Sequence, residues 1–125
     1  MSRSRISLTV DEDLRIWVVR YFGQIEGDEI NDSLMDQLVR IDQVWTYDNL
    51  IDMRRYDGTV LVGEIEELGQ RWAEHARGRD LGCFTAVNST DPLVKARMPV
   101  TQSLFPSRNL AHFDNFEEGL EWLKH

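Results

Sequence analysis

The chain has 125 residues, of which 42% are hydrophobic and 29% charged, a composition typical of a folded protein and too apolar for a disordered one. Its 22 acidic residues outnumber its 14 lysines and arginines, so the net charge is -8. This balance argues against nucleic acid and anionic membranes as partners, because both demand concentrated positive charge. The length predicts a single domain over residues 1–125.

Cysteine content and apolar patterning indicate the compartment. A single cysteine, Cys83, allows no intramolecular disulfide, which suits a reducing cytoplasm. The N-terminal sequence MSRSRISLTV lacks the apolar stretch of a secretory signal. No uninterrupted apolar run approaches the roughly 18 residues of a membrane-spanning helix. We therefore expect a cytoplasmic protein without an integral membrane segment.

Two strands are predicted at the start of the chain. Residues 6–10 alternate apolar and polar side chains, the period-two pattern of a strand with one solvated face. The acidic residues 11–13 then form a turn. Residues 14–22, LRIWVVRYF, are rich in β-branched and aromatic residues at both parities, so this strand should be covered on both faces and pair with the first as a hairpin.

Two long helices are predicted from apolar residues that recur at helical spacing. The first begins with Asp28 as its N-cap and extends to Trp45. The second carries its apolar stripe from Leu61 to Trp72 and ends at Gly78, which can serve as a C-cap. A third strand, residues 48–53, lies between these two helices.

The C-terminal part continues the alternation of strands and helices. Residues 81–87, LGCFTAV, form a continuous apolar run that predicts a buried parallel strand at the centre of the sheet. A third helix opens at residues 90–92, and Pro99 should kink, restart or stop it. Residues 110–113 form a fifth strand, and a last short helix follows Asp114 as its cap. The order predicts an α/β fold with a mainly parallel five-stranded sheet, an antiparallel N-terminal strand and about four helices.

With its elements in this order, the chain resembles the STAS or SpoIIAA-like group, which includes anti-sigma-factor antagonists and domains of sulfate transporters. The resemblance extends from Ser7 to Lys124 and is carried by LIDM at residues 50–53, the helix that follows, and LAHFDNFEEGLEWL at residues 110–123. This closing pattern is similar to uncharacterised bacterial SpoIIAA-like proteins in particular. The resemblance implies a single SpoIIAA-like domain.

The phosphorylation switch of this group is not expected here. Antagonists that are switched by phosphorylation carry an Asp-Ser-Ser/Thr-Gly motif just after the third strand. The corresponding segment of this chain reads YDGTVLVGE, residues 56–64, and Thr59 is its only aliphatic hydroxyl, displaced from the expected place. The phosphoacceptor serine motif is therefore lacking.

One candidate ligand site lies at the end of the third strand. Asp52, Arg54 and Arg55 fall where open α/β sheets tend to bind ligands, and a guanidinium suits phosphate or carboxylate. The start of the next helix, near Thr59, would add unpaired amides. The alternative is a strand that becomes polar where it leaves the core, since no glycine-rich phosphate loop is present.

A second candidate is an apolar pocket or an interface. Trp17 and Tyr21 share one side of the second strand, and the irregular segment 95–110 adds Met98 and Phe105. These four residues could line a pocket or face a second subunit. The remaining tryptophans fall on the inner stripes of predicted helices, which indicates core packing.

No catalytic residue, metal site or cofactor is predicted. The three histidines lack the spacing and clustered acids of a zinc site. Cys83 sits in an apolar run without a cationic neighbour in sequence, so we expect an inert buried thiol.

Three functions are compatible with these features. The leading hypothesis is a non-catalytic binding or regulatory protein of a bacterial cytoplasm that binds a protein partner or a small ligand, with homodimerisation as a companion hypothesis. The second is a carrier of a small hydrophobic or lipid ligand. Its cavity is expected to be lined by Trp17, Leu61, Phe84 and Met98. The third is an enzyme or sensor for a small anionic ligand at the Asp52 site.

Overall fold

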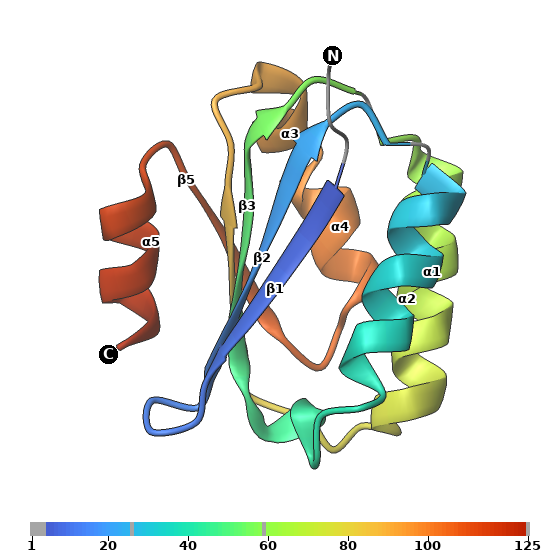
Figure 1. The fold of residues 1–125 in the computed structure, drawn as a ribbon, viewed down its shortest axis with the longest axis vertical. Helices are drawn as coiled ribbons and strands as arrows, with labels where there is room; N and C mark the ends of the chain where they lie inside the picture. The colour runs from blue at the N-terminus through green and yellow to red at the C-terminus, as the bar shows by residue number, and fades with distance from the viewer. Residues whose placement is uncertain (1–4, 26, 59, 125) are drawn as a thin grey trace.

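The computed structural model describes residues 5–25, 27–58 and 60–124. These residues form five strands, five α-helices and one 3-10 turn (Figure 1). In chain order the elements are β1 (Arg5–Asp11), β2 (Ile16–Gly23), α1 (Gly27–Leu38), η1 (Val44–Thr46), β3 (Asp48–Tyr56), α2 (Val62–Ala76), β4 (Phe84–Asn88), α3 (Pro92–Ala96), α4 (Met98–Leu104), β5 (Asn109–Phe113) and α5 (Phe116–Leu123).

The strands lie in the sheet in the order of the chain, from β1 to β5. β1 pairs with β2 in antiparallel orientation, and the three following pairs are parallel. The predicted fold class, a mainly parallel sheet with an antiparallel N-terminal strand, is thereby confirmed. The central strand is β3, so the prediction that residues 81–87 form the centre was wrong. A continuous apolar run indicates that a strand is buried on both faces, and both β3 and β4 are buried in this way. Such a run does not indicate the position of the strand in the sheet.

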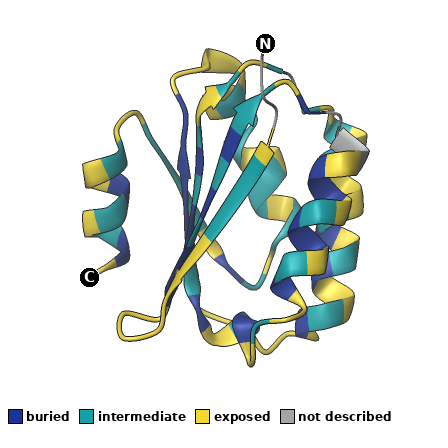
Figure 2. Cartoon of the chain, viewed as in Figure 1, coloured by how far each residue is buried: buried dark blue, intermediate teal, exposed yellow. Residues whose placement is uncertain are grey.

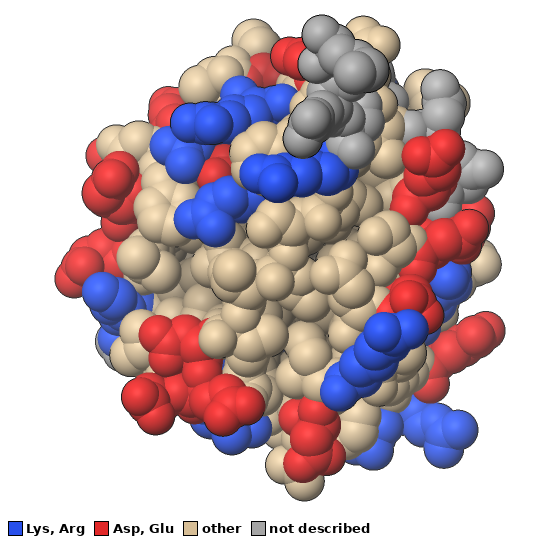
Figure 3. Space-filling model, viewed as in Figure 1, with Lys and Arg blue, Asp and Glu red and all other residues tan. Residues whose placement is uncertain are grey.

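Helices cover both faces of the sheet, but unequally. α1, α2 and α4 lie on one face and α5 alone lies on the other (Figure 1). The buried sides of the helices face the sheet (Figure 2). On the side of the molecule where β1 forms the edge, the middle of the surface carries no charged side chain, and charged groups surround it (Figure 3).

The sheet separates two apolar cores, because successive side chains of a strand point to opposite faces. In β2, Trp17, Val19 and Tyr21 join the core under α1 and α2, while Ile16 joins the core under α5. The α1–α2 core contains twelve buried residues: Trp17, Val19, Tyr21, Ile25, Ile30, Leu34, Met35, Leu38, Val44, Tyr47, Trp72 and Ala76. The α5 core contains Ile16, Leu50, Ala86 and Leu123.

The first helix is shorter than predicted. α1 ends at Leu38, and Trp45 lies in the separate turn η1 rather than at the end of a continuous helix. Ile41 and Trp45 still pack against the α1–α2 core. The segment after α1 therefore packs its apolar side chains against the same core as the helix does. For this reason the apolar residues keep their helical spacing in the sequence beyond the end of the helix.

The third predicted helix is divided in two, which brings the number of α-helices to five rather than four. Arg97 ends α3 and also precedes α4, and Pro99 occupies the first turn of α4, where its missing amide costs nothing. The last helix begins one residue later than predicted, because Asn115 and not Asp114 caps it. The Asn115 side chain accepts a hydrogen bond of 2.8 Å from the Glu118 amide.

Candidate ligand cavity

The face of the sheet under α1 and α2 is organised in two transverse rows. The strand registers align Trp17 with Asn49 and Asn49 with Thr85, which makes one row near the amino ends of the parallel strands. The next row, two residues further along each strand, contains Val19, Ile51 and Val87. The first row therefore carries polar groups and the second is entirely aliphatic.

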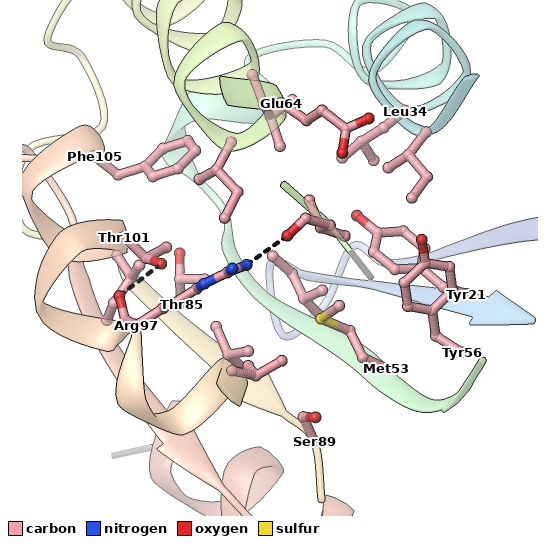
Figure 4. A pocket seen from close by; sticks show the side chains of 18 of the residues that line it. Tyr21, Leu34, Met53, Tyr56, Glu64, Thr85, Ser89, Arg97, Thr101 and Phe105 are labelled. Atoms are coloured by element: carbon pink, nitrogen blue, oxygen red, sulfur yellow. Dashed lines mark hydrogen bonds between the residues drawn. The ribbon is translucent and has the colours of Figure 1, made fainter. Parts of the chain in front are cut away.

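A cavity of about 160 Å³ lies between this face and the helices α1, α2, α3 and α4. Its wall is mainly apolar. The apolar side chains that line it are Trp17, Tyr21, Ile30, Leu34, Met35, Leu38, Ile51, Met53, Tyr56, Val60, Ile65, Leu68, Trp72, Val87, Leu93, Val94, Met98, Phe105 and Leu110. Figure 4 shows this lining, with Tyr21 and Tyr56 on one side and Phe105 on the other.

Four residues singled out from the sequence as pocket or interface candidates line this one cavity: Trp17, Tyr21, Met98 and Phe105. Only 4% of Trp17 and 4% of Tyr21 is exposed, so these side chains face the interior and do not present a surface to a second subunit. Two residues expected in the wall of a hydrophobic carrier lie elsewhere. Leu61 is 60% exposed, and Phe84 packs against Trp122 on the opposite face of the sheet.

The deep end of the cavity holds a buried arginine. The Arg108 guanidinium, which lines the cavity, donates to Thr85 Oγ1 at 2.8 Å, to Asn49 Oδ1 at 2.9 Å and to the Tyr47 carbonyl at 2.8 Å. Its Nη1 lies 3.6 Å from the carboxylate of Asp80. Burial lowers the pKa of Arg108, and the nearby carboxylate and acceptors compensate the charge.

Cys83 lies beside this polar group. It precedes β4 instead of lying inside the strand, and it is half-buried. Burial raises the pKa of its thiol, against the opposing influence of Arg108. A raised pKa keeps the thiol protonated and weakly nucleophilic at neutral pH.

The other end of the cavity opens near the carboxyl ends of the strands, the usual location of ligands in open α/β sheets. Glu64, Asp91 and Arg97 line this end. Glu64 accepts a hydrogen bond of 2.7 Å from the Leu61 amide, and Asp91 accepts one of 2.9 Å from the Leu93 amide. Both acids therefore cap helices, α2 and α3 respectively.

Two tyrosines form part of the wall near this opening. Their rings lie edge to face with centroids 5.9 Å apart, and the Tyr56 hydroxyl donates to the Ile25 carbonyl at 2.9 Å. Burial raises the pKa of Tyr21, and the neighbouring Tyr56 acts in the same direction. Tyr21 therefore remains neutral at any physiological pH.

The charges at the end of β3 do not join this cavity. Asp52 accepts hydrogen bonds of 2.9 Å from both Nε and Nη2 of Arg54 and lies 3.5 Å from Arg20. Both guanidinium groups lie 5.2 Å from the centroid of the Phe116 ring in α5, on the opposite face of the sheet. The arginines neutralise the buried carboxylate and cover the start of α5.

The pKa of Asp52 reflects this arrangement. Burial alone would raise it, but the hydrogen bonds and charge of Arg54, with the charge of Arg20, outweigh burial and lower it. Of the four residues proposed for an anion site, the structure thus brings together Asp52 and Arg54 only. Arg55 is exposed, and Thr59 lies outside the described residues.

Sequence reasoning missed the charged residues of the cavity: Glu64, Asp91, Arg97 and Arg108. Two of them lie in the segment 95–110, which was singled out for its apolar residues alone. The sequence feature that could have identified these two is the presence of Arg97 and Arg108 on either side of the apolar residues Met98 to Phe105. Nothing local indicates that Arg108 is 5% exposed, because its acceptors come from residues 23 to 61 positions away.

The described residues offer neither a metal site nor a membrane-spanning helix. Within residues 5–25, 27–58 and 60–124, no group of three or more histidine, cysteine or acidic side chains is placed to hold a metal ion. None of the helices in these ranges has the length and apolar character needed to cross a membrane.

Comparison with solved structures identifies the fold. The chain is similar to an uncharacterised protein of the DUF3478 family with a SpoIIAA-like fold from Shewanella loihica PV-4, with a TM-score of 0.63. The alignment covers 98% of this chain and 95% of that protein, at 16% identity. No family model matches the sequence, and no curated protein matches it. The chain has the SpoIIAA-like fold, as its sequence predicted.

Proposed function

We propose that the protein binds a small, largely apolar molecule in the cavity between the sheet and the helices α1, α2 and α4, without converting it chemically. The observation that carries this proposal is a largely apolar cavity that opens near the carboxyl ends of parallel strands. A folded core is normally filled to the density of an organic crystal, so an apolar space of this size has a cost in stability unless a ligand occupies it.

The size of the cavity limits the ligand. About 160 Å³ is close to the volume of an engineered protein cavity that accepts benzene, roughly 150 Å³. A single ring or a short chain fits such a space, whereas a lipid with long acyl chains does not. The proposal is therefore the small-ligand form of the hydrophobic carrier hypothesis, with a different wall from the one expected.

The other functions have less support. An enzyme or sensor for an anion at Asp52 requires available arginines, and Arg20 and Arg54 are occupied by that carboxylate. A phosphorylation switch requires the serine motif that segment 56–64 lacks. A protein partner remains compatible with the fold, but no described surface favours it over the cavity.

Methyl NMR with benzene as the probe tests the proposal directly. Benzene should shift the methyl signals of residues that line the cavity, such as Leu34, Leu68 and Val87, in a saturable way. The methyl groups of Leu81 and Val100, which are 80% and 45% exposed, serve as controls. If the cavity methyls do not respond more than these two, the proposal is wrong. As an independent measurement, native mass spectrometry of gently purified protein would identify any small molecule that co-purifies with it.

A further inference from the structure

Four charged residues line the cavity, and three of them are already compensated: Glu64, Asp91 and Arg108. Arg108 donates from Nε and Nη2 to protein acceptors, and its Nη1, which makes no hydrogen bond, lies 3.6 Å from the Asp80 carboxylate. Glu64 and Asp91 each accept from a backbone amide in the first turn of a helix. The unpaired amides at a helix start also favour negative charge. Each of these three charges is therefore balanced by a charge or a helix start within the protein.

Arg97 is the exception. Its Nη1 donates a hydrogen bond of 2.6 Å to the Val60 carbonyl, which is the only acceptor of its guanidinium among the described residues. A guanidinium has five N–H donors, and no described carboxylate forms an ion pair with this one. Figure 4 shows the Arg97 side chain extending from the segment that joins α3 and α4 into the cavity. A cation without an ion-pair contact to any described carboxylate thus borders an apolar space.

We propose that the ligand is a small carboxylic acid whose ionised carboxylate pairs with Arg97 and whose apolar body fills the cavity. This inference rests on the proposed function and adds the chemical class of the ligand. The forked donors of a guanidinium match the two oxygens of a carboxylate. The chain as a whole carries a net charge of -8 and repels anions, so a local cation is required to hold one.

The dimensions of the site suggest the probes. A cavity that accepts roughly a benzene ring has room for the ring of benzoate or the chain of hexanoate. Benzamide and hexanamide have the same shapes and the same number of non-hydrogen atoms, but they carry no charge. Each pair therefore separates the contribution of the charge from that of the apolar body.

The experiment compares the affinities of benzoate and benzamide, and of hexanoate and hexanamide, by NMR titration or calorimetry. We expect each carboxylate to bind about tenfold more tightly than its amide, the effect of one charge-assisted contact at a partly solvated site. Arg97→Gln should reduce this ratio to near one while the amides keep their affinity, which also shows that the variant is folded. Arg97→Lys should retain part of the preference.

Arg55→Gln is the matched control, because Arg55 is exposed and does not line the cavity. This variant should keep the full preference for the carboxylate. Equal binding of benzoate and benzamide by the unaltered protein would overturn the inference and leave the proposed function standing. Tighter binding of benzylamine than of benzoate would also overturn it, in favour of Glu64 or Asp91 as the partner of a cation. Failure of benzene and benzamide alike to bind would refute the proposed function itself.

Discussion

The indole nitrogen of Trp72 donates a hydrogen bond of 2.7 Å to the carboxylate of Asp80, and both residues are buried. The same carboxylate is the negative charge nearest to Arg108, at 3.6 Å. Asp80 therefore couples the helix α2 to the arginine at the deep end of the cavity. The exposed fraction of Asp80 is 3%, so the pair is withdrawn from water.

Asp80→Asn should destabilise the protein by about 3 kcal/mol, because it removes the carboxylate that forms an ion pair with the buried Arg108 guanidinium. The amide oxygen of asparagine can still accept from Trp72, so the variant isolates the effect of the charge. Urea unfolding at pH 7 measures the loss. Asp36→Asn is the control, since Asp36 pairs with Arg40 at the surface and should cost about 0.5 kcal/mol or less. Equal losses in the two variants would contradict the prediction.

Asp52 should make stability depend on pH. Its pKa is lowered in the folded protein, so its stabilising contribution is present above the unfolded pKa of about 4 and is lost as the pH falls through the folded pKa. We expect Asp52→Asn to cost about 1–2 kcal/mol at pH 7, because Arg20 and Arg54 are partly exposed and screened by solvent.

The difference between Asp52→Asn and the unaltered protein should shrink as the pH falls below about 4, because Asp52 takes up a proton there in the unfolded chain and only at lower pH in the folded protein. Denaturant unfolding of both proteins between neutral and acidic pH provides the measurement. Asp36→Asn, which removes a carboxylate paired at the surface, again serves as a control. A difference that stays constant down to the acid limit of folding would show that Asp52 is not the titrating group.

Two glycines in α2 should respond in opposite ways to alanine. A Cβ atom at Gly69 would lie 2.8 Å from the Leu104 carbonyl oxygen, where α2 passes close to α4. Gly69→Ala should therefore destabilise the protein despite the better helix propensity of alanine. Gly63 has no atom within 4 Å of such a Cβ, so Gly63→Ala should stabilise by up to about 1 kcal/mol. Thermal unfolding of both variants tests the contrast, and a stabilised Gly69→Ala would refute the close contact.

Val87→Phe should fill the cavity from the sheet side. Val87 lies in the aliphatic row and is 6% exposed. The larger ring should abolish the benzene response of the Leu34 methyl groups and raise stability by up to about 2 kcal/mol. Val100→Phe adds the same ring at an exposed site and should leave benzene binding unchanged. Unimpaired benzene binding by Val87→Phe would place the ligand elsewhere.

The fold could be predicted because its signals are local and agree with one another. The two-sided apolar pattern of β2 and the helical stripes reflect burial, which the structure confirms, whereas in β1 only Ile6 and Leu8 pack against a core and Val10 is exposed. The errors have the same origin. Trp45 has the apolar spacing of a helix although it lies outside α1. The apolar run at residues 81–87 indicated a buried strand but not the position of that strand in the sheet.

The cavity was predictable only in part. Trp17 and Tyr21 share a parity on β2, so their common face could be inferred, whereas their partners could not. Arg108 finds its acceptors through the pairing of three strands, and Asp52 turns away from the cavity because its parity on β3 is opposite to that of Ile51. Such placements depend on strand register, which a single sequence fixes only where one face is plainly polar.

The two faces of the sheet differ in how much change they can accept. Under α5 the packing is close, since a Cβ at Gly119 would already be in van der Waals contact with Leu50 at 3.4 Å and with Ala86 at 3.5 Å. On the other face, the connections around Val60 and from Asp91 to Arg97 border the opening and take no part in that packing. Substitutions in these connections should therefore alter which molecules enter, while the strand register and the α5 layer persist. Homologous chains of this fold could thus diverge in ligand preference through two short segments alone.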